Sequence, residues 1–370
     1  KEISDIPDDA QHYPWQKMLS AAPIAQPAEI APEEDIAVLQ YTGGTTGIPK
    51  GVILTHANVY INALQSSMWF AEAQPAQEKI LGVLPLFHVF AMTTIMHLGL
   101  HIGAELILHP KVDIKSILKD IEKKKPTLMP GVATLFTAIN NYKDLNKYSL
   151  KALKYCISGG GPLPQEVKIK FEALTGCVLV EGYGLSEASP VTHCNPLLGD
   201  NRTGFIGLPL SGTIAEIVDP TDKETLMPIG EQGELCIRGP QVMQGYWKQP
   251  EETANVLREG RLYTGDIAIM DERGYFAIVD RLKEMIISGG YNIYPRQVEE
   301  AIYRHESVAE CAVIGIPHEK WGETPKAFIV TKEGHTITKE EMKAFLKKEL
   351  ASYAQPRAYD FRDELPKTII

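Results

Sequence analysis

The residues from Tyr41 to Gly51 combine flexible and hydrogen-bonding residues with one positive charge (Tyr-Thr-Gly-Gly-Thr-Thr-Gly-Ile-Pro-Lys-Gly). Glycines let backbone N–H groups turn toward an anion without hindrance from a Cβ atom. Threonine hydroxyls add donors, and a lysine adds a charge that attracts phosphate. The segment therefore predicts a phosphate-binding loop, although a plain flexible turn is the simpler alternative. The residues expected to bind phosphate are Thr42, Gly43, Gly44, Thr45, Thr46, Gly47 and Lys50.

This loop differs from that of the ordinary P-loop NTPases. Their GxxxxGK[ST] pattern needs a glycine directly before the lysine, whereas Pro49 precedes Lys50 here. We expect the loop to follow a strand at 36–41 and to precede a helix at about 57–70.

Two further segments combine polar or flexible residues with apolar neighbours. Leu84-Pro-Leu-Phe-His-Val-Phe90 sets His88 among apolar and aromatic residues, which could border an acyl chain and its carboxylate; a histidine packed in the core is the alternative. Ser158-Gly-Gly-Gly-Pro-Leu-Pro164 follows a short apolar run. Its glycines would let a flat base approach the backbone closely, although a plain strand-to-helix turn fits as well.

Glu181-Gly-Tyr-Gly-Leu-Ser-Glu187 follows a predicted strand end, where open α/β sheets bind ligands. Tyr183 offers a ring for stacking on a base, and Ser186 offers a hydroxyl to a phosphate. Glu187 offers hard carboxylate oxygens of the kind that Mg²⁺ prefers. An ordinary polar loop is the alternative for this segment on its own.

In their order along the chain, these segments resemble the signature motifs of the adenylate-forming superfamily. That superfamily includes acyl-CoA synthetases, insect luciferases and the adenylation domains of peptide synthetases. The resemblance continues through Val52-Ile-Leu-Thr-His-Ala-Asn58 and recurs along nearly the whole chain. Residues 181–190 (EGYGLSEASP) are most similar to bacterial long- and medium-chain fatty acyl-CoA ligases. The family more often has threonine at the position of Ser186, but serine keeps the hydroxyl.

The resemblance assigns roles to these residues and to two motifs that carry little signal alone. It implies that the glycines at 159–161 line adenine. It also implies that Asp266 of Tyr263-Thr-Gly-Asp266 binds the ribose and that Arg281 contacts the ribose or phosphate region. The implied catalytic residues are Lys50, His88, Ser186 and Glu187, with Glu187 as metal ligand. The implied ATP-binding residues are the phosphate-loop set and Gly159, Gly160, Gly161, Tyr183, Gly184, Ser186, Asp266 and Arg281.

The segment from Asp280 to Pro295 resembles the family's hinge and the region after it. Lys283 is implied as the swivel between domains, and Ser288, Gly289 and Gly290 as contacts of coenzyme A. The final Leu365-Pro-Lys-Thr-Ile-Ile370 resembles the start of the family's last motif, whose lysine would fall two residues beyond Ile370. Lys367 does not match that lysine. The family's opening segment is also absent, so we expect a piece of a longer protein.

The activity implied is that of an acid–thiol ligase, in which a fatty acid reacts with ATP to give acyl-AMP and pyrophosphate. The acyl group then passes to coenzyme A, giving acyl-CoA and AMP. Mg²⁺ is the expected cofactor, with ATP and coenzyme A as co-substrates. Two alternatives stay open: an aryl-CoA ligase of the same superfamily, and a nucleotide- or acyl-adenylate-binding module without turnover. The acyl chain length and the oligomeric state, with a homodimer as one option, also stay open.

Composition narrows the class of protein. The chain has 370 residues, 44% hydrophobic and 23% charged, which is typical of a globular protein with more than one domain. Its net charge of −10 gives no basic surface for nucleic acid and argues against a polybasic membrane anchor. Five scattered cysteines without metal-site spacing suit a reducing cytoplasm, and no signal peptide is visible. The uncharged stretch 80–104 contains a proline, three glycines and three histidines. It suits a buried strand, loop and helix better than a membrane span, leaving at most peripheral membrane contact.

The elements that position these residues follow from the hydrophobic pattern. Up to about residue 204, apolar runs alternate with helical patterns, which predicts a parallel sheet with helices on both faces. The expected strands are 36–41, 80–86, 104–109, 127–129, 155–158 and 178–180, and Asp113 caps an expected helix to about 124. Strands at 213–218, 234–238 and 275–279 predict a β-rich subdomain.

After about residue 280 the pattern of predicted helices and strands changes again. It predicts helix 296–305, strands 311–316 and 327–331, and a helix with a capping box at Thr338 and Glu341. The predicted fold is therefore α/β, with a large domain of parallel sheets flanked by helices plus a β-rich, barrel-like subdomain, then a small α+β C-terminal domain. We expect domains at 1–280 and 281–370, with the hinge near Lys283.

Overall fold

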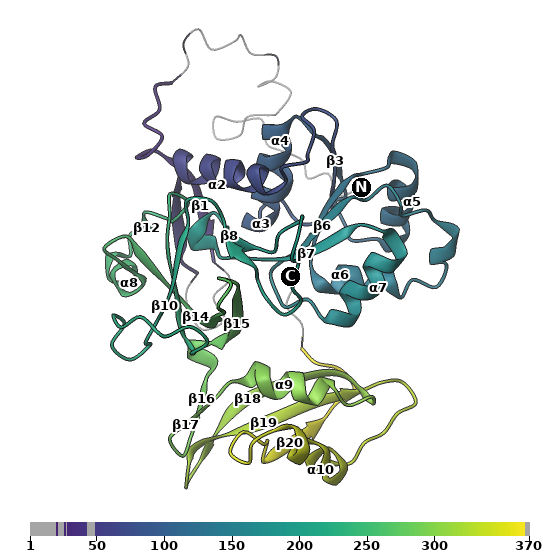
Figure 1. Ribbon diagram of the computed structural model, residues 1–370, viewed down its shortest axis with the longest axis vertical. Coiled ribbons are helices and arrows are strands. Elements are labelled where there is room, and N and C mark those ends of the chain that lie inside the picture. Colours follow the sequence, from purple (N-terminus) through teal and green to yellow (C-terminus); the bar gives the residue numbers. More distant parts are fainter. Residues whose placement is uncertain (1–19, 21–25, 27, 43–48, 367–370) are drawn as a thin grey trace, which may run out of the picture.

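The computed structural model of the chain describes residues 20, 26, 28–42 and 49–366. A seven-stranded sheet forms its centre, a β-rich part lies beside it, and a smaller C-terminal unit lies below both (Figure 1). The first five strands of the central sheet are parallel and the last two are antiparallel. In spatial order they are β4 (Glu105–Leu108), β3 (Lys79–Gly82), β5 (Leu128–Gly131), β6 (Tyr155–Ser158), β7 (Val178–Gly184), β8 (Val191–Cys194) and β9 (Leu208–Pro209).

Helices cover both faces of this sheet, as the alternation predicted. Neighbouring residues on one strand, such as Leu179 and Val180, are fully buried in two different apolar clusters. Because successive side chains of a strand point to opposite faces, both faces must be covered. On one face lie α5 (Ile114–Lys124), α6 (Ala133–Asn140) and α7 (Gln165–Thr175). On the other lie α2 (His56–Trp69), α3 (Val89–Ala91), a π-helix (Met92–His97) and α4 (Leu98–Ile102).

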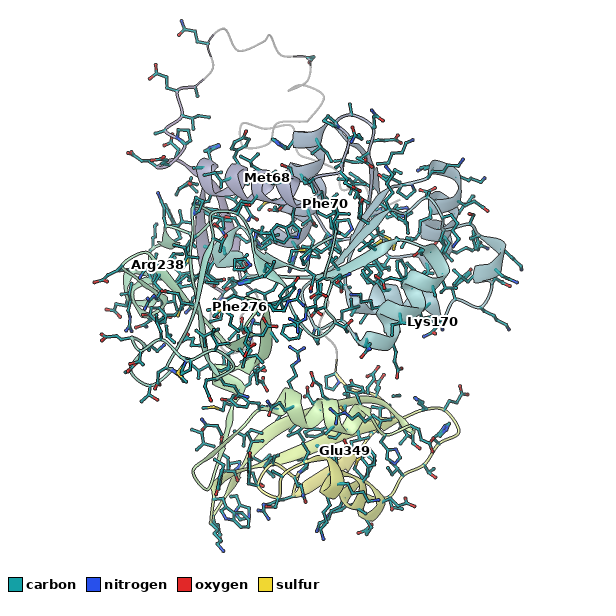
Figure 2. The ribbon with its side chains drawn as sticks, viewed as in Figure 1. Met68, Phe70, Lys170, Arg238, Phe276 and Glu349 are labelled. Atoms are coloured by element: carbon teal, nitrogen blue, oxygen red, sulfur yellow. The ribbon has the colours of Figure 1, made fainter. Side chains whose placement is uncertain are left out.

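Local signals fix the ends of these helices. Asp113 caps α5 by accepting a hydrogen bond from the Ser116 N–H (3.2 Å), as expected from the sequence. Thr55 and Asn58 form a capping box at the start of α2. Side chains fill the space between the layers, with Phe70 buried near the end of α2 and Lys170 exposed on α7 (Figure 2).

The β-rich part consists of two sheets that pack together. Leu54 of the smaller sheet and Leu262 of the larger are both fully buried in one apolar cluster, so the pair forms the barrel-like unit predicted. The smaller sheet contains β1 (Ile36–Tyr41), β2 (Gly51–Thr55) and β12 (Gly245–Tyr246). The larger contains β10 (Ile214–Val218), β11 (Gly233–Arg238), β14 (Arg261–Met270), β13 (Leu257–Arg258) and β15 (Phe276–Arg281), and α8 (Pro250–Val256) precedes β13.

The C-terminal unit has its own sheet and its own apolar cluster. Thr338 and Glu341 form the predicted capping box, and the helix after them buries Met342 and Leu346 against the sheet. The strands are β17 (Tyr291–Ile293), β16 (Ile286–Ser288), β19 (Gly322–Thr331) and β18 (Val308–His318), with β20 (Ala358–Phe361) parallel to β19. The helices are α9 (Pro295–Tyr303) and α10 (Lys339–Glu349).

Three short 3₁₀ turns complete the described elements, at Leu145–Lys147, Ser186–Ala188 and Leu282–Glu284. The last of them lies between β15 of the β-rich part and β16 of the C-terminal sheet. The predicted boundary at 280/281 lies at this change of sheet, while the hinge itself stays a prediction.

Some expectations about strands were wrong. The strand at 36–41, expected in the parallel sheet, is β1 of the separate antiparallel β1–β2–β12 sheet. The strand expected at 80–86 ends at Gly82, because a turn follows in which the His88 N–H donates to the Pro85 carbonyl (3.0 Å). The ten-residue strand β14 was not expected at all. The uncharged stretch 80–104 contains a strand, a loop and helices, as predicted. No helix in the described part of the chain is both long and apolar enough to cross a membrane.

Candidate active site

The predicted phosphate loop lies in the chain between the two antiparallel strands β1 and β2. Tyr41 on β1 pairs with Gly51 on β2, and the Thr42 N–H donates to the Lys50 carbonyl (3.0 Å). The helix expected after the loop at about 57–70 is α2, and the strand β2 lies between the loop and this helix. The predicted residues Gly43, Gly44, Thr45, Thr46 and Gly47 lie outside the described part of the chain.

Lys50 lies directly before β2 and is held by two side chains far away in the sequence. Its ammonium pairs with the carboxylate of Glu252, and Nζ lies 5.0 Å from the centroid of the Tyr246 ring. The Lys50 side chain is 32% exposed, so it keeps access to solvent and to a ligand. A lysine over an aromatic face gains a cation–π attraction, which favours this position.

The Tyr246 hydroxyl donates to Glu187 Oε1 (2.7 Å), so the tyrosine links the predicted phosphate-binding lysine to the predicted metal ligand. Burial and the negative charge of Glu187 raise the pKa of Tyr246, so its hydroxyl stays protonated and remains a donor. The main chain of Glu187 is held too, because the Met243 N–H donates to its carbonyl (2.8 Å).

Pairing between strands places Tyr246 there. Tyr246 on β12 is the register partner of Val52 on β2, two residues after Lys50. Its N–H donates to Thr253 Oγ1 on α8 (2.8 Å). Tyr246 and Glu252 were not predicted, because their contacts with Lys50 cross about two hundred residues and leave no local pattern.

The predicted ribose residues form a second cluster. Asp266 on β14 and Arg281 on β15 are cross-strand partners, with Arg281 Nε 3.0 Å from Asp266 Oδ1. The Tyr183 hydroxyl donates to the other carboxylate oxygen. Burial raises the pKa of Asp266, and the charges of Arg281 and Lys283 together with the Tyr183 hydrogen bond oppose that rise. Lys283, the predicted hinge residue, is therefore near enough to act electrostatically on the predicted ribose carboxylate.

The Tyr183 ring lies edge-on to His193, with centroids 6.0 Å apart. The buried Tyr183 hydroxyl has a raised pKa, first because of burial and then because of the Asp266 charge. Stacking of this ring on a base remains a prediction.

The glycine run at 159–161 and the segment around His88 lie against each other. A Cβ atom at Gly159 would come within 3.0 Å of the Phe90 ring, whereas one at Gly161 would meet nothing within 4 Å. Gly160 has a φ of +76°, a conformation that side chains disfavour. Gly160 and Gly161 therefore offer exposed backbone, while Gly159 is buried against Phe90.

His88 Nδ1 accepts a hydrogen bond from the Phe90 N–H (3.2 Å) and so caps α3. Burial lowers the pKa of His88, which favours the neutral ring. The Thr93 hydroxyl donates to the Ser189 carbonyl (2.6 Å), so the segment after His88 is bonded to the turn that follows Glu187. This contact brings the predicted carboxylate-binding loop to the predicted metal ligand.

Backbone crowding explains Gly184. A Cβ atom there would lie 2.2 Å from the Pro190 carbonyl oxygen, so no other residue fits. Ser186 is half-buried and begins the 3₁₀ turn that carries Glu187.

The predicted coenzyme A residues form a tight hairpin turn between β16 and β17. Ser288 pairs with Tyr291, and both Gly289 and Gly290 have positive φ (+59° and +86°). Two-residue hairpin turns of this kind favour glycine. The Gly289 N–H also donates to the Trp321 carbonyl (2.8 Å). The turn explains both glycines, and contact with coenzyme A remains a prediction.

The two clusters meet on one short segment. At one end Tyr183 contacts the Asp266–Arg281 pair, and at the other Glu187 contacts the Tyr246–Lys50 pair. The two ends are four residues apart, a span of at most about 14 Å.

The described residues contain no group of three or more His, Cys, Asp or Glu side chains that could hold a metal ion. Such a set is not needed for Mg²⁺, which commonly binds through one or two carboxylates together with substrate phosphates and water. Glu187 fits that role, because Tyr246 is its carboxylate's one hydrogen-bond donor in the described part of the chain.

The sequence matches two protein-family models. The AMP-binding enzyme model matches residues 2–247, and the AMP-binding enzyme C-terminal domain model matches residues 297–370. A long-chain-fatty-acid–CoA ligase of Bacillus subtilis (strain 168) is 52% identical over 92% of this chain and 61% of its own length. One of Escherichia coli O6:H1 is 42% identical over 92% of this chain and 60% of its own length. The chain thus spans about 60% of the length of these curated relatives.

Solved structures agree with the fold. ATP-bound MatB from Rhodopseudomonas palustris gives a TM-score of 0.85 at 32% identity, covering 91% of this chain and 66% of that one. O-succinylbenzoate coenzyme A synthetase from Bacillus subtilis, in complex with ATP and magnesium ion, gives a TM-score of 0.82 at 28% identity. That match covers 95% of this chain and 72% of the other. These matches confirm the predicted α/β architecture with a small C-terminal domain.

Proposed function

This chain belongs to the AMP-binding enzyme family, and from that premise we propose that it activates a fatty acid as its acyl adenylate and then forms acyl-CoA. The observation that supports this most directly is the convergence on residues 183–187. One end of that segment contacts a carboxylate–guanidinium pair suited to a ribose. The other end is the Glu187 carboxylate, which Tyr246 links to Lys50, and these two charges suit metal-bound phosphates.

In this proposal the adenine lies against the glycine run at 159–161, of which Gly160 and Gly161 are exposed, and near Tyr183, and the ribose hydroxyls bind Asp266. The phosphates bind Lys50, Ser186 and the 42–50 loop. Glu187 would hold Mg²⁺, which supplies positive charge to the phosphates when bound. The relative solved with ATP and magnesium ion supports that metal choice.

The first step is an in-line displacement at the α-phosphorus of ATP. A carboxylate oxygen of the fatty acid attacks the α-phosphorus, the bond to the β-phosphate oxygen breaks, and pyrophosphate leaves. Lys50 stabilises the charge that develops on the leaving group, and the neutral His88 ring borders the acid without adding a charge. The protein's work is mainly positioning and electrostatics.

For the second step we propose that residues 281–370 move as a unit relative to 1–280, about Lys283. The 3₁₀ turn that contains Lys283 connects two different sheets, which suits a swivel. After the movement, the turn at Ser288–Gly290 would contact coenzyme A, whose thiol attacks the acyl carbonyl and releases AMP. The activity is proposed for the cytoplasm, with at most peripheral membrane contact, and a homodimer is one possible assembly.

An aryl acid is the second candidate substrate. Relatives named for feruloyl-CoA and O-succinylbenzoate coenzyme A synthesis support it. An apolar hollow between α2, the π-helix and the sheet has a volume of about 10 Å³, about the space that one water molecule needs. That is below the roughly 300–1,000 Å³ typical of small-molecule sites, so it does not decide between the two acids.

The test is AMP release by the complete protein from Mg²⁺-ATP and coenzyme A. The acids range from acetate to oleate and include benzoate and a cinnamate, with reactions lacking acid or coenzyme A as controls. Release that peaks with a medium or long fatty acid supports the proposal, and a peak with an aromatic acid favours the second candidate. No acid-dependent release would contradict both and favour a binding module.

A further inference from the structure

Tyr246 contacts both charged side chains that the proposed function assigns to the phosphates. Its hydroxyl donates to Glu187 (2.7 Å), and its ring lies under Lys50 at 5.0 Å from the ammonium. The side chain is only 7% exposed, so a ligand could reach it mainly through these two neighbours.

The surrounding backbone holds Tyr246 in place independently of any ligand. Strand pairing joins it to Val52, and its N–H is bonded to Thr253 on α8. The N–H of the next residue, Trp247, donates to the carbonyl of Gly51, the residue that follows Lys50 (2.7 Å). The Met243 N–H likewise donates a hydrogen bond to the Glu187 carbonyl. Residues 243–247 therefore connect two motifs that lie more than 130 residues apart.

We propose that Tyr246 is a positioning residue of the nucleotide-phosphate site. Its hydroxyl orients the Glu187 carboxylate toward the metal, and its ring sets the place of Lys50 beside the phosphates. The inference rests on the proposed function, because that function assigns Glu187 and Lys50 to Mg²⁺ and phosphate.

The chemistry of a tyrosine suits this task better than that of a cationic residue. A hydroxyl donates to one carboxylate oxygen and leaves the negative charge of Glu187 available to a cation. An arginine or lysine in its place would neutralise that charge and compete with the metal. A phenylalanine would keep the ring under Lys50 but lose the hydrogen bond to Glu187, which separates the two contacts experimentally.

The first experiment measures nucleotide affinity by isothermal titration calorimetry in the complete protein, without fatty acid or coenzyme A. Tyr246→Phe should weaken binding of Mg²⁺-ATP about tenfold, since a hydrogen bond to a charged group is lost. It should also raise the Mg²⁺ concentration needed for half-saturation with ATP. Binding of AMP without metal should stay within about twofold, because AMP reaches neither the metal nor the outer phosphates.

Tyr275→Phe is the matched control. Tyr275 is equally buried (5% exposed), and its hydroxyl also donates to a single acceptor, the Asp200 carbonyl (2.8 Å). It lies away from Lys50 and Glu187, so its variant should bind both nucleotides like the wild type.

A double-mutant cycle with Glu187→Gln tests the route of the effect. If Tyr246 acts through Glu187, adding Tyr246→Phe to Glu187→Gln should weaken Mg²⁺-ATP binding by much less than about tenfold. Full additivity would overturn the inference, as would an equal loss of AMP binding or an unchanged Mg²⁺-ATP affinity in Tyr246→Phe. Wild-type protein that binds neither nucleotide would instead overturn the proposed function itself.

Discussion

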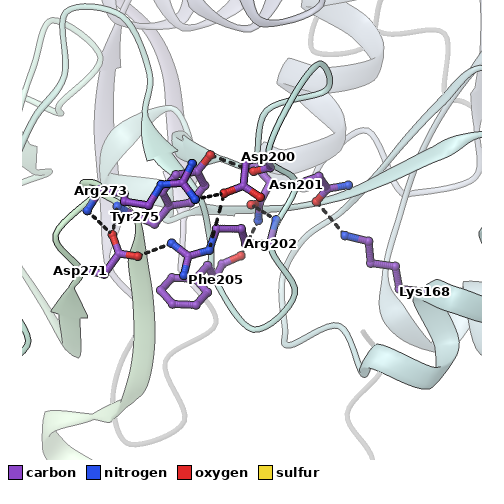
Figure 3. Close-up of polar contacts among 9 residues, drawn as sticks. Lys168, Asp200, Asn201, Arg202, Phe205, Asp271, Arg273 and Tyr275 are labelled. Carbon is purple, nitrogen blue, oxygen red and sulfur yellow. Dashed lines mark hydrogen bonds and ion pairs between the residues drawn. The ribbon is translucent and has the colours of Figure 1, made fainter.

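Two charged clusters in the large part of the chain look alike in exposure but differ in charge balance. Around Arg202, two arginines and two aspartates pair with one another, and the guanidinium lies 4.2 Å from the Phe205 ring (Figure 3). Around Lys50, the lysine pairs with one glutamate, Glu252, and the partner of a second glutamate, Glu187, is the uncharged Tyr246 hydroxyl.

The difference separates structural charge from charge available to a ligand. The Arg202 cluster is electrically balanced and joins the loop after β8 to the β14–β15 hairpin, so its charges stabilise the contact between two parts of the fold. The Lys50 cluster carries one excess negative charge, on a carboxylate without a cationic partner among the described residues. An unpaired carboxylate next to a lysine is the arrangement expected where a metal and a polyanion bind together.

Removal of Glu187 should therefore have the largest functional effect. Glu187→Ala should lower Mg²⁺-ATP-dependent AMP formation by about 100-fold or more, with the fold intact, because the carboxylate for the metal is lost. AMP formation and the midpoint of thermal unfolding are the two measurements. Unchanged AMP formation would show that Glu187 does not hold the metal and that the two clusters do not differ in function.

Hydrogen bonds through Asn195 connect Glu181 to the Arg202 cluster. Its carbonyl accepts from the Asn195 N–H (2.9 Å), and Asn195 in turn accepts from the Arg202 N–H (3.0 Å). Burial raises the pKa of the Glu181 carboxyl from its usual 4.5 to about 7, and the charge of Arg296 on α9 opposes the rise.

Since the unfolded chain releases this proton at lower pH than the folded one, stability is lost as pH rises from about 4.5 to 7, by on the order of 3 kcal/mol. Glu181→Gln should remove that part of the pH dependence and leave Mg²⁺-ATP affinity within about twofold. Denaturant unfolding of both proteins between pH 5 and 8 measures it. Parallel curves for wild type and variant would show that Glu181 ionises normally.

Arg202→Met keeps an unbranched, mostly apolar side chain, shorter than that of arginine, and removes its charge. We expect a loss of about 1–2 kcal/mol in the free energy of unfolding, from two ion pairs and two ring contacts, with nucleotide affinity unchanged. Urea titration and calorimetry are the measurements. A large fall in Mg²⁺-ATP affinity at wild-type stability would show that Arg202 contributes to nucleotide binding and not only to stability.

The hinge proposal predicts a smaller and selective effect. Lys283→Pro restricts the backbone of the 3₁₀ turn between β15 and β16, so it should slow the movement between the two steps. Acyl-CoA formation should fall at least about fivefold more than acyl-AMP formation, as measured by separate assays of the two half-reactions. Equal loss of both would contradict a hinge at this residue.

Local signals made much of the fold predictable. The strands at 36–41 and 155–158 and the capping box at Thr338 have the limits that their apolar runs and cap residues indicated. The strand β14 escaped because Tyr263-Thr-Gly-Asp266 reads as a turn. Gly265 does have a φ of +72°, yet the strand continues through it with an irregular register against β11.

The site was only partly predictable, for a related reason. Its motif residues stand in recognisable local patterns, and the structure brings Tyr183 to Asp266 and Arg281. Tyr246, Glu252 and the balanced pairs around Arg202 depend on contacts between distant strands and loops. Neither residue type nor spacing reveals which charges will find an internal partner, and that property distinguishes the two clusters.

The most direct test of the account is a crystal structure of the complete protein with ATP and Mg²⁺. The account predicts a metal about 2.0–2.1 Å from a Glu187 carboxylate oxygen, phosphates beside Lys50, and the ribose hydroxyls on Asp266. Lys50 should then have exchanged Glu252 for phosphate. A nucleotide bound elsewhere, or a metal held by other carboxylates while Glu187 still contacts only Tyr246, would contradict it.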